Sequence, residues 1–225
     1  MNNKIRRCLR LVILCFAFVV AFFGCSTKAY ASKDVTSKLK NDKGIKWITK
    51  NMIYYGAIEH ERGNISNNKI VKFKMNATNK YSIAAVLTAN KYRKYDSKKY
   101  KEPKYKDNKL YMPLINVSDA NKLYKKLYGS NVNYEKVKNK KGYFLKKKKK
   151  CYAIFGEFGT VIPKYSIEEI IKKKKGIYRI TAKIKLKMDD GSQIYTVGTM
   201  WITVKKDKKA TYGYKVKNIS YTMLN

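Results

Sequence analysis

The sequence predicts an α+β fold in which N-terminal helices pack on a curved antiparallel sheet of about six strands. Two patterns lead to this prediction. Apolar residues recur at helical spacing over 45–56 and again before Gly129, whereas the last third alternates apolar and polar residues as strands do. Successive elements usually lie side by side, so we expect one domain over 45–225, with a helical and mixed part at 45–129 and an antiparallel meander at 143–225.

The first 31 residues have the features of an export signal. A basic start precedes an apolar run at 11–23, and Ala29-Tyr30-Ala31 matches the small-x-small pattern of a cleavage site. The run is shorter than the roughly 18 residues of a transmembrane helix. We therefore expect a signal peptide at 1–31 and a secreted, extracellular or cell-wall-associated protein. The alternative is a membrane-anchored lipoprotein, because Cys25 follows the apolar run as in a bacterial lipobox.

Positive charge dominates the composition. The chain has 52 Lys and Arg against 15 Asp and Glu, and its formal net charge is +37. A field of this size attracts polyanions, with association that weakens as salt rises. Lys far outnumbers Arg, and Lys acts as a hydrated point charge, whereas Arg suits bidentate recognition of phosphates and bases. The composition favours diffuse attraction over specific readout; drift in an AT-rich genome is the alternative origin of the charge.

The first half begins with a polar stretch at 32–44, which we expect to be a flexible lead. Ile45, Ile48, Met52 and Tyr55 then fall on one face of a helix that ends near Gly56.

Two further segments precede the next helix. Alternation at 71–75 predicts a strand, and the apolar segment 82–90 suits either a short helix or a buried strand.

A lysine- and tyrosine-rich stretch at 91–109 has almost no aliphatic residues, so we expect a long surface loop. The helix that follows is the best defined in the chain. Ser118 or Asp119 can cap its start, Leu123 and Leu127 belong to its apolar face, and Gly129 suits a left-handed C-terminal position.

Residues 178–188 alternate strictly and predict a strand with one wet face. A turn then leads to a central strand at 193–204, in which Gly198 marks a bend or bulge. In the last strand, 211–223, the apolar phase shifts between Val216 and Ile219, and a bulge accounts for the shift.

The segments 143–148 and 151–157 predict a hairpin around a lysine run. Residues 165–171 allow two interpretations, a capped helix and a strand. We favour the strand because it completes the meander.

Two segments resemble parts of uncharacterised secreted proteins of low-GC Gram-positive, clostridial gut-type bacteria: GEFGTVIPKYSI at 156–167 and KATYGYKVKNISY at 209–221. The resemblance is confined to the C-terminal half and implies no activity. A helix followed by a long-stranded meander is also similar in outline to NTF2-like or cystatin-like folds, whose sheets often cup a ligand or bind a partner.

Residues for catalysis or metal binding are sparse. His60 is the only histidine, and a zinc-protease helix would need a second one where Asn64 stands. Cys151 lies in an alternating segment and suits a small buried residue. We therefore expect a non-enzymatic protein with no cofactor and no metal site.

Two groups of residues are candidates for binding. Lysine runs at predicted turns of one sheet are candidates for a patch that binds anionic polymers, with separately solvated turn lysines as the alternative. Tyrosines of the 91–109 loop can stack on bases or sugar rings or can pack back onto the domain. The lysines are Lys146, Lys147, Lys148, Lys149, Lys150, Lys172, Lys173, Lys174 and Lys175, and the tyrosines are Tyr92, Tyr95, Tyr100 and Tyr105.

These observations lead to two functional hypotheses. The first is an exported protein that associates with anionic envelope polymers, such as teichoic acid or acidic polysaccharide, with an anionic lipid surface or with a surface partner, and binds nucleic acid only non-specifically. The second is a small-molecule or peptide binder that uses the concave face of the sheet, with Trp201 and nearby tyrosines as walls.

Overall fold

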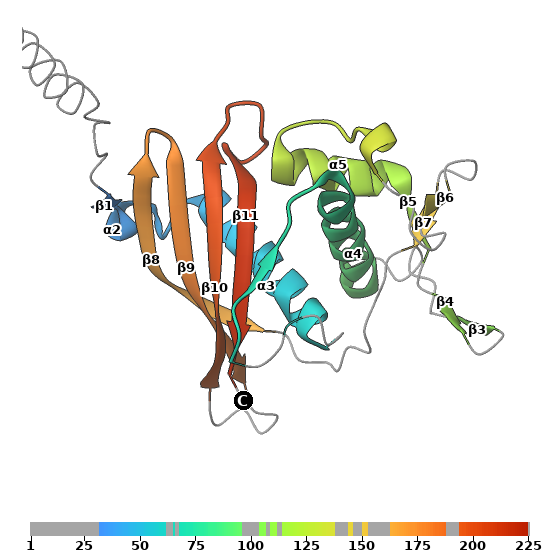
Figure 1. The fold of residues 1–225 in the computed structure, drawn as a ribbon, viewed down its shortest axis with the longest axis horizontal. Coiled ribbons are helices and arrows are strands. Elements are labelled where there is room, and N and C mark those ends of the chain that lie inside the picture. Colours follow the sequence, from blue (N-terminus) through green and yellow to red (C-terminus); the bar gives the residue numbers. More distant parts are fainter. Residues whose placement is uncertain are drawn as a thin grey trace, which may run out of the picture. The chain divides into compact units, whose positions relative to one another are not determined.

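The computed structural model describes residues 32–61, 65, 68–95, 104–106, 109–111, 114–137, 144–145, 150–152, 163–187 and 194–224. Helices, an antiparallel sheet of six strands and two smaller sheets make up this part of the chain, which confirms the predicted α+β class (Figure 1). The strand order is β1-β8-β9-β10-β11-β2. The bounds are β1 Lys33–Asp34, β2 Val71–Phe73, β8 Lys164–Lys174, β9 Ile177–Lys187, β10 Ile194–Lys206 and β11 Tyr214–Met223.

The long strands follow the predicted alternation. In β9, Ile180, Ala182 and Ile184 are fully buried, while the residues between them lie on the other face. Segment 165–171 belongs to β8, so the strand interpretation is confirmed and the helix is excluded.

Both predicted irregularities are present as bulges. The β9–β10 register shifts between Thr196 and Gly198. The β10–β11 register shifts where Thr203 pairs with Asn218 and Val204 with Val216. Each shift keeps the apolar residues on the buried face.

The helices are α2 Thr36–Leu39, α3 Lys43–Glu61, α4 Ala77–Tyr95 and α5 Val117–Tyr128. Helix α3 contacts β9, β10 and β11, and its Ile45, Ile48 and Met52 are fully buried. The ambiguous segment 82–90 is the centre of α4, which continues to Tyr95. Helix α5 ends as predicted, because Gly129 adopts φ 69° and its N–H donates to the Lys125 carbonyl at 2.8 Å.

Gly56 lets α3 lie directly on the sheet. A Cβ there would stand 2.2 Å from Cε1 of Tyr221 in β11. The Tyr221 hydroxyl donates a 2.7 Å hydrogen bond to the Met52 carbonyl, so the ring also ties strand to helix. Burial of this ring raises the pKa of Tyr221 well above its usual value.

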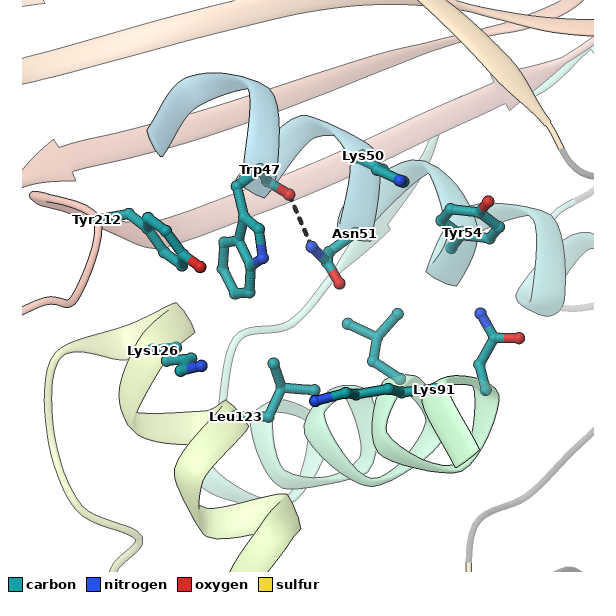
Figure 2. Close-up of a pocket in the computed structure, with 10 residues that line it drawn as sticks. Trp47, Lys50, Asn51, Tyr54, Lys91, Leu123, Lys126 and Tyr212 are labelled. Carbon is teal, nitrogen blue, oxygen red and sulfur yellow. Dashed lines mark hydrogen bonds between the residues drawn. The ribbon is translucent and has the colours of Figure 1, made fainter. Parts of the chain in front are cut away.

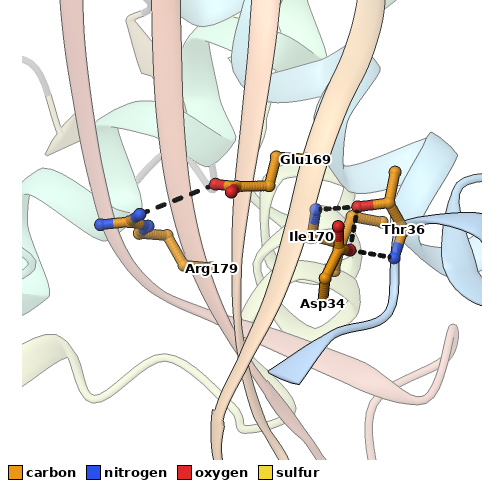
Figure 3. Close-up of polar contacts among 5 residues, drawn as sticks. All are labelled: Asp34, Thr36, Glu169, Ile170 and Arg179. Carbon is orange, nitrogen blue, oxygen red and sulfur yellow. Dashed lines mark hydrogen bonds and ion pairs between the residues drawn. The ribbon is translucent and has the colours of Figure 1, made fainter. Parts of the chain in front are cut away.

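The expected flexible lead at 32–44 is wrong. This segment forms β1 and α2, and Val35 and Leu39 pack against the core. Thr36 holds this segment against the sheet. Its hydroxyl accepts a hydrogen bond from the Ile170 N–H at 2.7 Å and donates one to Asp34 at 2.6 Å (Figure 3). The polar composition suggested solvation, but these polar groups find partners on β8.

The predicted meander also needs correction. The hairpin within 143–157 is present as β6 Phe144–Leu145 and β7 Lys150–Tyr152, but β7 also pairs with β5 Leu114–Asn116, and the three strands form a separate sheet. A further pair consists of β3 Lys104–Lys106 and β4 Lys109–Tyr111. The main sheet is completed by β1 and β2 instead. Strands that follow one another in the sequence therefore pair from β8 to β11. At the two edges of the sheet, the short strands β1 and β2 from the first half of the sequence pair with β8 and β11.

Candidate functional site

The predicted lysine patch does not form on one sheet. Lys150 belongs to β7 in the three-stranded sheet, whereas Lys172, Lys173 and Lys174 belong to β8 in the six-stranded sheet. Lys175 lies in the turn before β9. Lys146–Lys149 lie outside the described residues. The expectation that both runs lie on one sheet is wrong, because the described strands of the 143–157 hairpin belong to the three-stranded sheet; binding of anionic polymers by these lysines stays a prediction.

Where the structure describes the predicted tyrosine loop, at 91–95, 104–106 and 109, it has regular secondary structure. Tyr92 and Tyr95 belong to α4 and Tyr105 to β3, while Tyr100 lies outside the described residues. The stretch 91–95 continues the helix because the apolar segment before it packs into the core. Stacking by these rings stays a prediction.

A pocket of about 310 Å³ lies between α3, α4 and α5 and is closed on one side by the β10–β11 loop (Figure 2). Helix α3 supplies Trp47, Lys50, Asn51 and Tyr54, and the other elements supply the rest of the lining. The remaining residues are Leu87, Asn90 and Lys91 of α4, Leu123 and Lys126 of α5, and Tyr212 of the loop.

An aromatic pair forms one wall. The rings of Trp47 and Tyr212 stack with centroids 4.5 Å apart and planes 27° apart. The loop that carries Tyr212 sits directly on the first turn of α3, since a Cβ on Gly44 would come within 2.2 Å of the Tyr212 carbonyl oxygen. A 2.6 Å ion pair between Lys215 and Asp207 and a φ of 74° at Gly213 close the same loop. The aromatic wall is thus held by the contact of the loop with α3 and by the contacts within the loop itself.

Helix α3 itself orients the amide group of Asn51 on the side of the pocket that this helix forms. Asn51 donates from Nδ2 to the Trp47 carbonyl at 2.7 Å, and its Oδ1 points into the space between the helices (Figure 2). This bond leaves the amide oxygen of Asn51 available to a ligand donor. On the opposite side, Leu87 and Leu123 give the pocket an apolar floor.

The electrostatic character of the pocket is cationic. Lys50, Lys91 and Lys126 come from three different helices, and no acidic side chain is among the lining residues. Lys91 and Lys126 extend beneath Trp47 (Figure 2). Lysines from three helices around a partly apolar space favour an anion there through their positive field, which salt screens because Lys50 and Lys91 are exposed.

The lining offers hydrogen-bond donors, aromatic faces and positive charge, but no carboxylate, imidazole or thiol. Elsewhere in the described residues, no cluster of three or more His, Cys, Asp or Glu side chains could hold a metal ion. These groups can bind and orient a ligand through charge, ring contacts and hydrogen bonds.

Trp201 is not a wall of this pocket. Its strand neighbours Met200 and Ile202 are fully buried on the helix-covered side, so Trp201 points to the opposite face. The predicted ligand site on the sheet with Trp201 as a wall is thus not where the described pocket lies.

Part of the site was visible in the sequence. Trp47, Asn51 and Tyr54 recur at helical spacing beside the apolar stripe of α3, which indicates a second contact face on that helix. Lys91 and Lys126 carry no comparable signal, because solvated lysines occur throughout the chain. Only the packing of three helices assigns them to one pocket.

Comparison of the chain with protein-family models, curated proteins and solved structures finds no match. Within the described residues, none of the helices combines the length and the apolar character that a membrane span requires. The chemistry of the pocket and of the surface is therefore what bears on function.

Proposed function

We propose that this chain is an exported, non-enzymatic binding protein whose pocket between α3, α4 and α5 holds a small organic anion with an apolar or ring-shaped body. One observation carries the proposal: lysines from three helices surround an aromatic-walled pocket, and none of the described residues that line it is acidic. Export is supported by the signal-like residues 1–31, and the lack of catalytic side chains in the lining supports binding rather than turnover.

The size and the polarity of the pocket define the ligand further. Ligand sites typically range from about 300 to 1,000 Å³, so a pocket of about 310 Å³ suits a small molecule or the end of a larger one. Leu87 and Leu123 would contact the apolar body, and the lysines would face the acidic group. Lys attracts charge without imposing a bidentate geometry, so carboxylate and phosphate both fit.

A matched set of ring probes tests this proposal. Benzoate and phenyl phosphate should bind the full chain more tightly than neutral benzamide or cationic benzylamine. The chain has two tryptophans, so a Trp201→Phe background leaves Trp47 as the fluorescence reporter inside the pocket. Equal affinity for benzoate and benzamide would contradict an anion site.

The lysine contribution is measured with two variants of equal charge. Lys50→Gln/Lys91→Gln/Lys126→Gln should weaken benzoate binding about tenfold, since each partly exposed ion pair contributes about 0.2–1 kcal/mol. Replacing Lys38, Lys40 and Lys136 by Gln should change it less than twofold, because these lysines are exposed and do not line the pocket. Equal losses would assign the binding to overall charge.

A second candidate function is association with anionic polymers of the cell envelope, such as teichoic acid or acidic polysaccharide. The net charge of +37 and the excess of Lys over Arg support it. Retention on immobilised teichoic acid and heparin across a salt series tests it, because counterion release makes such binding steeply salt-dependent. Elution of the parent near physiological salt from both supports would remove this candidate.

A further inference from the structure

The six-stranded sheet has a face that the described helices do not cover. One side of the sheet faces the helices and carries the fully buried Ile180 and Ile202. On the other side a cross-strand row crosses five strands, because residues paired across neighbouring strands point to the same face. From β8 to β2 the row is Glu169, Thr181, Trp201, Ser220 and Lys72.

Figure 3 shows which side this is. The Glu169 and Arg179 side chains lie on the near side of the strands, and the helices lie behind them. Thr181 pairs with both Glu169 and Trp201 in the sheet register, so Trp201 shares this open face. With neighbouring strands about 4.8 Å apart, the row spans roughly 19 Å.

Hydroxyl and amide side chains surround Trp201. Thr203 flanks it along β10 and pairs with Asn218 of β11, whereas Thr199, its other neighbour on this face of β10, is buried. Thr181 and Ser220 lie beside it in the row. The half-buried indole thus lies among small polar side chains.

The charges on this face are mostly positive. Its acidic groups gather at the β1–β8 edge and each has a local partner: Asp34 accepts from Thr36, Glu168 from Ser166, and Glu169 pairs with Arg179 at 3.7 Å. Basic residues extend over the rest of the face. They are Lys72 on β2, Lys164 on β8, and Lys183 and Lys185 on β9.

We propose that this open face binds an anionic polysaccharide. Trp201 stacks on the apolar face of a sugar ring, the surrounding hydroxyl and amide groups hydrogen-bond to sugar hydroxyls, and Lys72, Lys183 and Lys185 attract the acidic groups of the chain. The inference rests on the second candidate function, association with anionic polymers, and is independent of the pocket.

Two other polyanions fit the face less well. Single-stranded nucleic acid is held by successive aromatic side chains, whereas Trp201 is the one aromatic ring in its cross-strand row and its neighbours are hydroxyl-bearing. An anionic membrane favours inserted apolar side chains, and the large exposed apolar residues among those described, Ile70 and Leu224, lie outside these rows. The positive charge of the face and the small polar side chains around Trp201 together favour acidic sugar polymers.

The test measures binding of the full chain to polygalacturonate, with pullulan as an uncharged polysaccharide, duplex DNA, and phosphatidylglycerol vesicles. Parent protein should bind polygalacturonate more tightly than pullulan. Trp201→Ala should weaken polygalacturonate binding about tenfold and leave its salt dependence unchanged, because the indole carries no charge. Lys72→Gln/Lys183→Gln/Lys185→Gln should weaken it and make the salt dependence shallower.

Controls separate this face from general charge and from misfolding. Replacing Lys38, Lys40 and Lys136 by Gln should change the affinity less than twofold. Thr203→Glu adds a negative charge to the face without removing the indole and should also weaken binding. Benzoate binding in the pocket should persist in every face variant, which shows that the helix layer is intact.

Three results overturn the inference. Parent-like polygalacturonate binding by Trp201→Ala and Thr203→Glu excludes this face as the site. An equal loss in the two lysine triples also excludes it and leaves the candidate function standing on overall charge. Greater loss for DNA or vesicles than for polygalacturonate assigns the face to another class of partner. If the parent binds none of the charged polymers, the candidate function itself fails as well.

Discussion

The helix-lined pocket and the open face of the sheet are both rich in lysine, yet they differ in how their residues are brought together. Side chains from three helices and a loop line the pocket, which has an aromatic wall and an apolar floor. The open face is built by alternation along five paired strands. A pocket of this size suits a small anion, whereas an open sheet face suits a long polymer.

The two regions share one framework, the contact between α3 and β11. Gly56 and Tyr221 meet there, and α3 also carries four residues of the pocket lining. The open face lies on the other side of the same strands. A change in this contact should therefore affect both regions, while changes confined to one should spare the other.

Gly56→Ala should have the largest effect. The new Cβ would overlap the Tyr221 ring, which a buried hydrogen bond holds in place, and overpacking of this kind costs about 1–3 kcal/mol of unfolding free energy. Chemical denaturation followed by circular dichroism measures the loss, and both benzoate and polygalacturonate binding should weaken. Lys46→Ala, on the exposed side of the same helix, is the control and should change stability by less than about 0.5 kcal/mol. Unchanged stability in Gly56→Ala would show that α3 can move away from β11 without loss of unfolding free energy.

Tyr212→Ala should affect the pocket alone. Removing the ring that stacks on Trp47 takes away one aromatic contact, which contributes about 0.5–1.5 kcal/mol, so benzoate affinity should fall roughly three- to tenfold. Tyr212→Phe keeps the stacking and should bind like the parent. Polygalacturonate binding should be unaltered in both variants; a parallel loss there would mean that the two regions are coupled.

Stability at high pH should depend on Tyr214, at the junction of the loop and the sheet. Burial, and then the charges of Asp42 and Tyr178, raise the pKa of Tyr214 to about 12. The folded state keeps this proton longer than the unfolded chain, so the stabilisation is present below pH 10 or so and is lost as pH rises through about 12. Melting temperatures from pH 8 to pH 11.5 should fall more for the parent than for Tyr214→Phe. Parallel curves would contradict the assignment.

Thr49→Val should have the smallest effect. The Thr49 hydroxyl in α3 is buried and has no hydrogen-bond partner among the described residues. Replacing it by a methyl group of similar shape should leave stability unchanged or raise it by up to about 1 kcal/mol. Denaturation curves measure this, and neither binding activity should change. A clear loss of stability would reveal a partner for that hydroxyl.

Local patterns predicted much of the fold. The alternation of β9, the C-terminal stop of α5 at Gly129 and the bulges at Gly198 and after Val216 are all confirmed. Each depends on a few neighbouring residues: period-two burial, a left-handed glycine, or a shift in apolar phase. Such features are encoded within a single element and can be read from the sequence without its partners.

The sequence by itself determined the α+β class, the long strands of the meander and the cationic character of the chain. The tertiary structure decided the edges of the sheet, where Thr36 ties β1 to β8, and the helical state of 91–95, whose composition had indicated a loop. It also decided the pocket. Lys50, Lys91 and Lys126 converge only because three helices pack at particular angles, and the periodicity within one helix does not specify its orientation against another.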